Sequence, residues 1–264
     1  MGINVRILML GRGRFFNGFS NDFLQIVPSL GHNLEEIIWK TIKKTTNVTL
    51  ISSQIGQDNF VDKHLKGRRN GFFVEIGGYD GESFSNSLFF EQKRNWTGLL
   101  VEANPYLYKI MVAKERSCAM AHTCISRTLP TMDFKLAGPI TAAVNTISAA
   151  HLRRINDEAK VMDKLQIGKG YGSVVATNCT TLDALLQELS VKHVDYFSLD
   201  VEGAEMLVLE SIDWDKMDVD IFTIETQEHR AEIITLMIGH GYRHVVPRPL
   251  SNDDVFVRRA PSHL

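Results

Sequence analysis

An apolar segment that runs directly into a glycine-rich, acidic turn constrains the fold of this chain most. Residues 72–76 read Phe-Phe-Val-Glu-Ile, and residues 77–82 read Gly-Gly-Tyr-Asp-Gly-Glu. A short apolar run of this kind predicts a buried strand of a parallel sheet. The glycines allow the backbone to turn tightly where side chains would clash. The segment therefore predicts an α/β protein with a ligand site where this strand ends.

A second apolar strand is expected at 98–102, and it ends in Glu102. An acidic residue at the tip of the strand after a glycine loop, about 20 residues on, is placed to accept the hydroxyls of a ribose. We therefore predict a cofactor that contains adenosine. The alternative is an ordinary strand, turn and helix without a ligand, which is common in α/β proteins.

The charge of the turn distinguishes between adenosine cofactors. A dinucleotide-binding turn reads G-x-G-x-x-G and leaves a helix N-terminus free for a pyrophosphate, which Glu75, Asp80 and Glu82 would repel. A P-loop is excluded because G-x-x-x-x-G-K-[ST] does not occur in the chain. Carboxylates suit the sulfonium and ammonium groups of S-adenosylmethionine, which is the cofactor that we predict.

The remainder of the chain predicts alternating strands and helices around a doubly wound, Rossmann-like sheet that is mostly parallel and has an antiparallel closing strand. Further strands are expected at 118–123, 132–136, 173–177, 194–200, 219–224, 242–246 and 255–258. Helices are expected from Ser83 or Ser85 to Glu91, and at 148–165, 182–189, 203–211 and 229–239. We divide the chain into a helical extension or cap at 1–51 and a catalytic domain at 52–264, with a substrate-side insertion at 131–172.

Composition narrows the possible partners and the compartment. The 264 residues carry a formal charge of −2, which gives no overall reason to expect nucleic acid as a partner. Cys118, Cys124 and Cys179 are odd in number and have no C-x-x-C or zinc spacing, so reduced, buried thiols are expected. No apolar segment is long enough to span a membrane, and no secretory signal is visible, so a cytoplasmic protein is expected.

A second group of acidic residues is expected at the same edge of the sheet as the glycine turn. Asp200 ends one strand, Glu225 ends another, and Glu202 and Glu205 open the helix after Asp200. Asp200, Glu202 and Glu225 are our candidate catalytic residues, which could accept a hydroxyl proton directly or through a divalent cation. We assign no metal, because one or two carboxylates do not make a metal site. The alternative for Glu202 and Glu205 is that they complement the positive end of a helix.

Several motifs together resemble the FkbM family of S-adenosylmethionine-dependent methyltransferases. They span about residues 52–259 and are the segments Phe73–Gly81, Val101–Pro105, Thr181–Asp183, Leu199–Glu205 and Asn252–Val257. The segments Ser53–Asp58, Ser85–Glu91 and Trp96–Leu100 look like the animal Star-like branch, some members of which serve in membrane trafficking without an established methyltransferase role.

The resemblance implies a class I methyltransferase fold, S-adenosylmethionine as cofactor and methyl transfer to an oxygen, often on a sugar or another small molecule. It places the methionine part at the turn, the ribose at the end of the second strand and the adenine after the third strand. The implied cofactor-binding residues are Glu75, Gly77, Gly78, Tyr79, Asp80, Gly81, Glu102, Ala103, Asn104, Ile125, Ser126 and Asp200. Gly78 departs from the alanine common in the family, and Ser198 stands where many members have lysine.

Two other functions stay open from the sequence. The first is a non-catalytic Star-like module that keeps the fold and acts through protein partners. The intact set of Glu75, Asp80, Glu102 and Asp200 weighs against it. The second is RNA 2′-O-methylation, which usually brings a Lys-Asp-Lys-Glu tetrad, and no lysine stands at the ends of the strands that carry Asp200 and Glu225.

Overall fold

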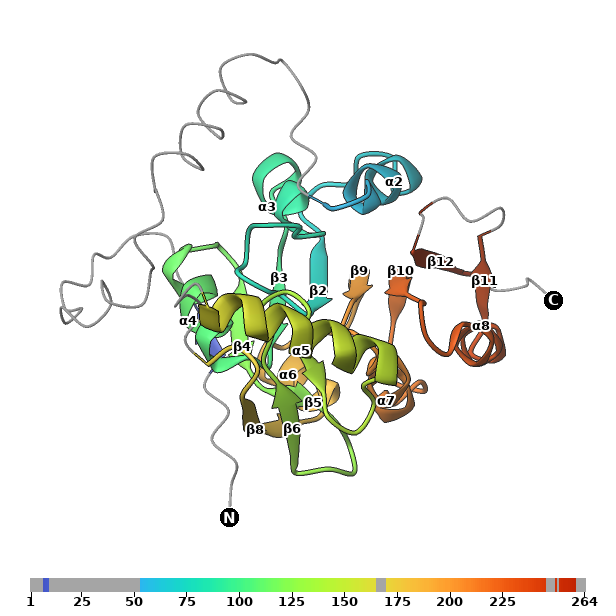
Figure 1. Cartoon of the computed structure of the whole chain (residues 1–264). Helices are drawn as coiled ribbons and strands as arrows, with labels where there is room; N and C mark the ends of the chain where they lie inside the picture. Colours follow the sequence, from blue (N-terminus) through green and yellow to red (C-terminus); the bar gives the residue numbers. More distant parts are fainter. Residues whose placement is uncertain (1–6, 10–52, 165–169, 246–249, 251, 260–264) are drawn as a thin grey trace.

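The computed structural model describes residues 7–9, 53–164, 170–245, 250 and 252–259 (Figure 1). The helical cap expected within 1–51 lies outside the described residues. In this region the structure describes only β1 (Ile7–Met9). Among the helices that the structure describes, none combines the length and the apolar character that a membrane crossing requires.

The centre of the fold is an eight-stranded sheet that is mostly parallel. Its spatial order is β1, β4 (Ala119–His122), β3 (Thr97–Glu102), β2 (Phe72–Ile76), β9 (Val194–Leu199), β10 (Val219–Glu225), β12 (Asp253–Arg258) and β11 (Tyr242–His244). The five strands from β4 to β10 are parallel, whereas β12 is antiparallel to both of its neighbours. The expected antiparallel closing strand is therefore confirmed.

Helices cover both faces of this sheet, as a doubly wound fold requires. On one face α2 (Gln57–His64), α3 (Leu88–Arg94) and α4 (Pro105–Ala113) pack on a core that contains Phe73 and Tyr196. On the other face α6 (Leu182–Glu188), α7 (Glu205–Ser211) and α8 (Arg230–Gly239) pack on a core that contains Val74 and Phe197. The alternation of adjacent residues between faces is what the pleat of a strand dictates.

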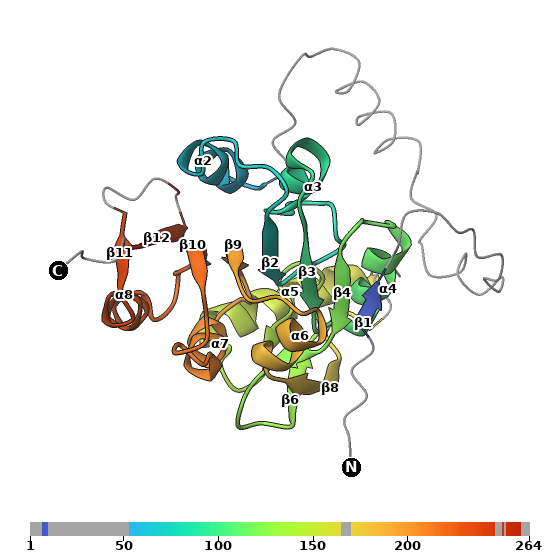
Figure 2. The same ribbon diagram turned by 180° about the vertical axis from the view of Figure 1, so that it is seen from behind.

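A second, smaller sheet lies at one end of the large sheet, together with α5 (Ala149–Lys164) (Figures 1 and 2). Its order is β5 (Cys124–Ile125), β8 (Val174–Thr180), β6 (Thr131–Lys135) and β7 (Ala142–Ala143). The elements expected at 132–136, 148–165 and 173–177 correspond to β6, α5 and β8. The strand expected at 118–123 corresponds to β4 of the large sheet, and the short β5 of the small sheet follows it.

The expectation of reduced thiols is wrong for two of the three cysteines. Cys124 and Cys179 form a disulfide, whereas Cys118 is a buried free thiol. The two bonded residues are 55 apart in sequence, and they meet because β5 and β8 pair in parallel with Cys124 opposite Cys179. The disulfide therefore links two neighbouring strands of the small sheet, close to where the chain leaves β4.

Candidate functional site

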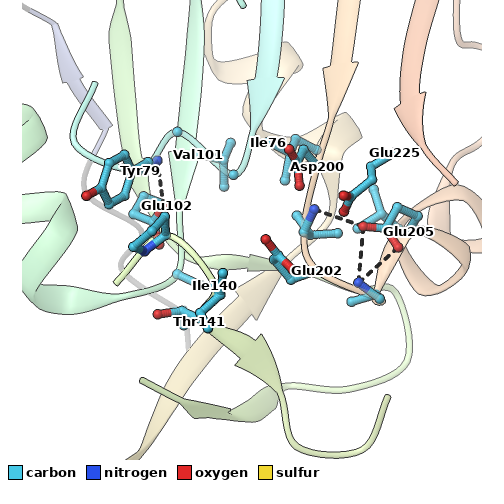
Figure 3. Close-up of a pocket in the computed structure, with 18 of the residues that line it drawn as sticks. Ile76, Tyr79, Val101, Glu102, Ile140, Thr141, Asp200, Glu202, Glu205 and Glu225 are labelled. Atoms are coloured by element: carbon cyan, nitrogen blue, oxygen red, sulfur yellow. Dashed lines mark hydrogen bonds between the residues drawn. The ribbon is translucent and has the colours of Figure 1, made fainter. Parts of the chain in front are cut away.

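A pocket of about 660 Å³ opens where the parallel strands of the large sheet end and the small sheet begins (Figure 3). Its size lies in the range typical of sites for small ligands and cofactors. Most of the predicted site residues line it, namely Glu75, Gly77, Gly78, Tyr79, Glu102, Ala103, Ile125, Asp200, Glu202 and Glu225. The fold thus brings together residues that are up to 150 positions apart in sequence.

Glu102 is held at the tip of β3 by two backbone donors. The N–H of Tyr79 donates to Oε2 at 2.8 Å (Figure 3), and the N–H of Asn104 donates to Oε1 at 2.7 Å. Burial raises the pKa of Glu102 to about 7, although these donors oppose the shift. Each oxygen keeps a lone pair that can accept a further hydrogen bond, as the predicted contact with a ribose requires.

Glu75 is buried and its carboxylate is already engaged by the segment after the glycine turn. Oε2 accepts hydrogen bonds from the hydroxyls of Ser85, at 2.9 Å, and of Ser87, and Oε1 accepts the N–H of Asn86 at 2.8 Å. These contacts explain why α3 begins at Leu88 rather than at Ser83 or Ser85, as we had expected. Of the two expected caps, Ser85 binds Glu75 instead, and Ser83 Oγ donates to Asp80 Oδ2 at 2.7 Å.

The other predicted cofactor-binding residues shape the loops around the pocket. Asp80 accepts the N–H groups of Glu82 and Ser83, Ser126 accepts that of Leu129, and Gly81 lies against Met111 of α4. Asn104 caps α4, and its Nδ2 donates to Thr141 Oγ1 at 3.1 Å. Asn104 thereby connects the tip of β3 to Thr141, just before β7. The part of these residues in cofactor binding stays a prediction.

Three carboxylates meet on one wall of the pocket, as the sequence predicted for Asp200, Glu202 and Glu225. One oxygen of each lies within 4.8 Å of the others. Burial raises the pKa of Asp200 well above its usual range, and the charges of Glu225 and Glu202 add to the shift. Burial, followed by the charges of Glu225 and Glu205, raises the pKa of Glu202 to about 8. The cluster therefore favours protons or other positive charge.

Glu205 has a different task from its neighbours. Its Oε1 accepts the N–H of Val201 at 2.9 Å, and its Oε2 accepts that of Gly203 at 3.1 Å (Figure 3). These bonds fix the loop in which Glu202 adopts a positive φ of 55°. Burial raises the pKa of Glu205 to about 7. Glu205 thus holds the loop that presents Asp200 and Glu202 to the pocket.

His151 reaches the acidic cluster from the insertion and was not predicted from the sequence. Its Nδ1 lies 3.6 Å from Glu202 Oε2, and its Nε2 lies 3.0 Å from the carbonyl oxygen of Ile140. An Nε2–H that donates to this carbonyl leaves Nδ1 facing Glu202. A lone histidine in a helical pattern carries no sequence signal for this contact, because it depends on where α5 packs.

We expect the ligand-free protein to lose thermal stability as the pH rises from about 5 to 8. Glu102, Glu202 and Glu205 have pKa values of about 7, 8 and 7 in the fold, against 4.5 as the usual value. The folded state therefore holds more protons than the unfolded state in this window, so unfolding becomes easier as these protons are lost.

Melting temperatures measured between pH 5 and 8 test this expectation. Glu202→Gln should flatten the decline, because glutamine does not ionise, whereas Glu210→Gln, at an exposed site on α7, should follow the wild type. A Glu202→Gln protein with the same pH dependence as the wild type would contradict the assigned shift.

A family model and several solved structures are similar to this chain. The family model described as the methyltransferase FkbM domain matches residues 75–244. No curated protein sequence matches the chain. One similar solved structure is a precorrin-6y C5,15-methyltransferase from Geobacter metallireducens, with 8% identity and a TM-score of 0.37 over 76% of this chain and 85% of that one.

Two further solved structures have the same level of similarity. A TehB-like SAM-dependent methyltransferase from Corynebacterium glutamicum has 8% identity and a TM-score of 0.38, over 85% of this chain and 96% of that one. A SAM-dependent methyltransferase from Aquifex aeolicus has 9% identity and a TM-score of 0.34, over 83% and 95%. The family match extends over more than half of the residues and includes the glycine turn, Glu102 and the acidic cluster. The chain belongs to the FkbM family of S-adenosylmethionine-dependent methyltransferases.

Proposed function

We propose that the protein transfers a methyl group from S-adenosylmethionine to a hydroxyl of a sugar or another small molecule. The observation that carries this proposal is the cluster of Asp200, Glu202 and Glu225, which lines the same pocket as the glycine turn and Glu102. One wall can therefore bind an adenosine cofactor while another accepts a proton.

The donors and acceptors of the pocket fit S-adenosylmethionine. Glu102 would hold the ribose, and the carboxylates of the cluster favour a ligand with positive charge. When bound, this cofactor supplies an electrophilic methyl group. The protein has to align the acceptor hydroxyl with that group, keep water out and take up the hydroxyl proton.

Asp200 is our candidate for the proton acceptor. It follows β9 directly, and the loop that carries it is fixed by Glu205. Glu202 and Glu225, whose oxygens lie close to that of Asp200, would share the proton that is taken up. The three oxygens would also suit a divalent cation such as Mg²⁺. Activity that disappears with EDTA and returns with Mg²⁺ would show that a cation held by these carboxylates helps the acceptor hydroxyl to lose its proton.

The charge of the pocket supports a neutral acceptor. Carboxylates at the reacting end repel phosphate groups, which disfavours RNA as the substrate. The lining also includes the amide side chains of Gln54, Gln57 and Gln227. Phe84, which is 56% exposed, adds an aromatic ring that stacks near Tyr79. An exposed ring beside amides and carboxylates suits a polyhydroxylated molecule with one apolar face.

Calorimetric titration with S-adenosylmethionine and S-adenosylhomocysteine tests the cofactor half of the proposal. We expect micromolar dissociation constants for the wild type and at least tenfold weaker binding for Glu102→Ala, because the hydrogen bonds to the ribose hydroxyls are lost. Glu188→Ala, at an exposed position on α6, is the matched control and should bind as the wild type does.

The same titration separates this proposal from a non-catalytic, partner-binding module. A wild-type protein that binds neither ligand would favour the partner-binding function. Binding that survives Glu102→Ala unchanged would contradict the proposed position of the ribose. With binding established, transfer of a labelled methyl group to a panel of sugars and other hydroxylated small molecules identifies the acceptor.

A further inference from the structure

A buried hydrogen-bond acceptor without a partner lies in the wall of the pocket. Asn86 is 6% exposed, and its Nδ2 donates to the hydroxyl of Ser198 at 2.8 Å. Its Oδ1 accepts no hydrogen bond from any residue that the structure describes. Buried carbonyl oxygens are almost always paired, so this atom is expected to accept from a ligand.

The neighbouring carboxylate of Glu75 is poorly placed to accept a hydrogen bond from the ligand. Its oxygens already accept two hydroxyl groups and the N–H of Asn86. Arg116, which is buried behind them, donates to the hydroxyls of Ser85 at 2.9 Å and Ser87 at 3.1 Å. Glu75 therefore holds the backbone of Asn86 in place and adds negative charge behind its amide. This environment favours a cationic donor over a neutral one.

The order of the strands indicates which part of the cofactor would reach Asn86. Ser198, which holds the amide, lies on β9, directly beside Glu75 on β2. Glu102 lies on the other side of β2, at the end of β3, and Ile125 follows β4, which is one strand further. A cofactor with its ribose at Glu102 and its adenine near Ile125 extends its amino-acid end toward β2 and β9.

We propose that Asn86 Oδ1 accepts a hydrogen bond from the ammonium group of the methionine part of S-adenosylmethionine, and that Ser198 orients the amide for this contact. The assignment rests on the proposed function and gives Asn86 the contact that the sequence suggested for Glu75. The ammonium group is the one donor of this end of the cofactor, because the carboxylate beside it only accepts hydrogen bonds.

Calorimetry with two matched ligands tests the assignment. One ligand is S-adenosylhomocysteine, and the other is its deaminated analogue, in which hydrogen replaces the ammonium group. Asn86→Ala should weaken binding of S-adenosylhomocysteine about 10- to 100-fold, as expected for a hydrogen bond to a charged group, and change binding of the analogue less than about twofold. Ser198→Ala should weaken S-adenosylhomocysteine selectively and to a smaller extent.

Glu102→Gln is the matched control, because it should weaken both ligands by the same factor. If Asn86→Ala and Ser198→Ala weaken the binding of both ligands equally, the assignment to the ammonium group is overturned and the proposed function still stands. The same holds for unchanged binding of S-adenosylhomocysteine by a folded Asn86→Ala protein. A wild-type protein that binds neither ligand would overturn the proposed function and the assignment together.

Discussion

Replacement of Gly77 by alanine should cost about 4 kcal/mol or more of unfolding free energy and remove cofactor binding. Gly77 has a φ of +92°, and a Cβ atom there would lie 1.8 Å from the backbone carbonyl oxygen of Asp200. This oxygen cannot move aside easily, because the N–H of Asp200 donates to the carbonyl of Ile76 at 3.1 Å. The turn after β2 and the loop after β9 would have to separate.

Urea denaturation followed by circular dichroism measures this effect. Gly239→Ala is the matched control, because Gly239 ends α8 and a Cβ atom there would meet nothing within 4 Å. Its unfolding free energy should stay within about 1 kcal/mol of the wild-type value or increase, because alanine favours helix. A Gly77→Ala protein as stable as the wild type would mean that the two loops can separate without cost.

The close approach of Gly77 to the carbonyl oxygen of Asp200 also gives a different reason for glycine at this position of the turn. From the sequence, its glycines were expected to make room for the ligand. In the structure, the Cβ that Gly77 lacks would meet the loop that carries Asp200, which belongs to the protein itself. The first glycine of the turn therefore lets the turn after β2 and the loop after β9 lie against each other. The sequence predicts where the turn lies. The reason that position 77 must be glycine depends instead on a contact between residues that are far apart in sequence.

Strands were predictable where local pattern and tertiary environment agree. The run at 194–200 is mostly apolar apart from Asp195 and Ser198, and it corresponds to β9, with Asp200 directly after the strand. The helix expected at 182–189 is also confirmed as α6, which Thr181 caps, since its Oγ1 accepts the N–H of Ala184. In contrast, α4 was missed although its signals are present, since Asn104 caps it and Pro105 is its first residue.

Other features could not be read from the sequence, because they depend on how distant elements pair. The disulfide follows from the register of β5 against β8, and the odd number of cysteines gave the opposite expectation. The contact of His151 with Glu202 follows from the packing of α5. Asn86 lies in a motif that the sequence analysis identified. That its Oδ1 has no partner among the described residues depends on the contacts of Asn86 with Ser198 and Glu75 in the fold.

Replacement of Asp200 by asparagine should lower the kcat of methyl transfer about 10²- to 10⁴-fold while leaving the affinity for S-adenosylhomocysteine within about threefold. Asparagine has a similar shape but cannot take a proton from the acceptor hydroxyl. Asp215→Asn, at an exposed site, is the matched control and should keep wild-type turnover. An Asp200→Asn protein with normal turnover would exclude Asp200 as the base.

The number of protons released on ligand binding distinguishes a role of Asp200 as the base from a merely structural role. In the ligand-free pocket, burial and the charges of Glu225 and Glu202 raise the pKa of Asp200 well above its usual range, so its carboxyl group takes up a proton more readily than an exposed aspartate does. The positive sulfonium of S-adenosylmethionine should lower that pKa, whereas S-adenosylhomocysteine carries a neutral sulfur. Calorimetry in buffers of different ionisation enthalpy should therefore detect more proton release with S-adenosylmethionine. Asp200→Asn should remove most of this difference between the two ligands, because asparagine has no carboxyl proton to release. The same deprotonation of Asp200 is what its role as the base requires.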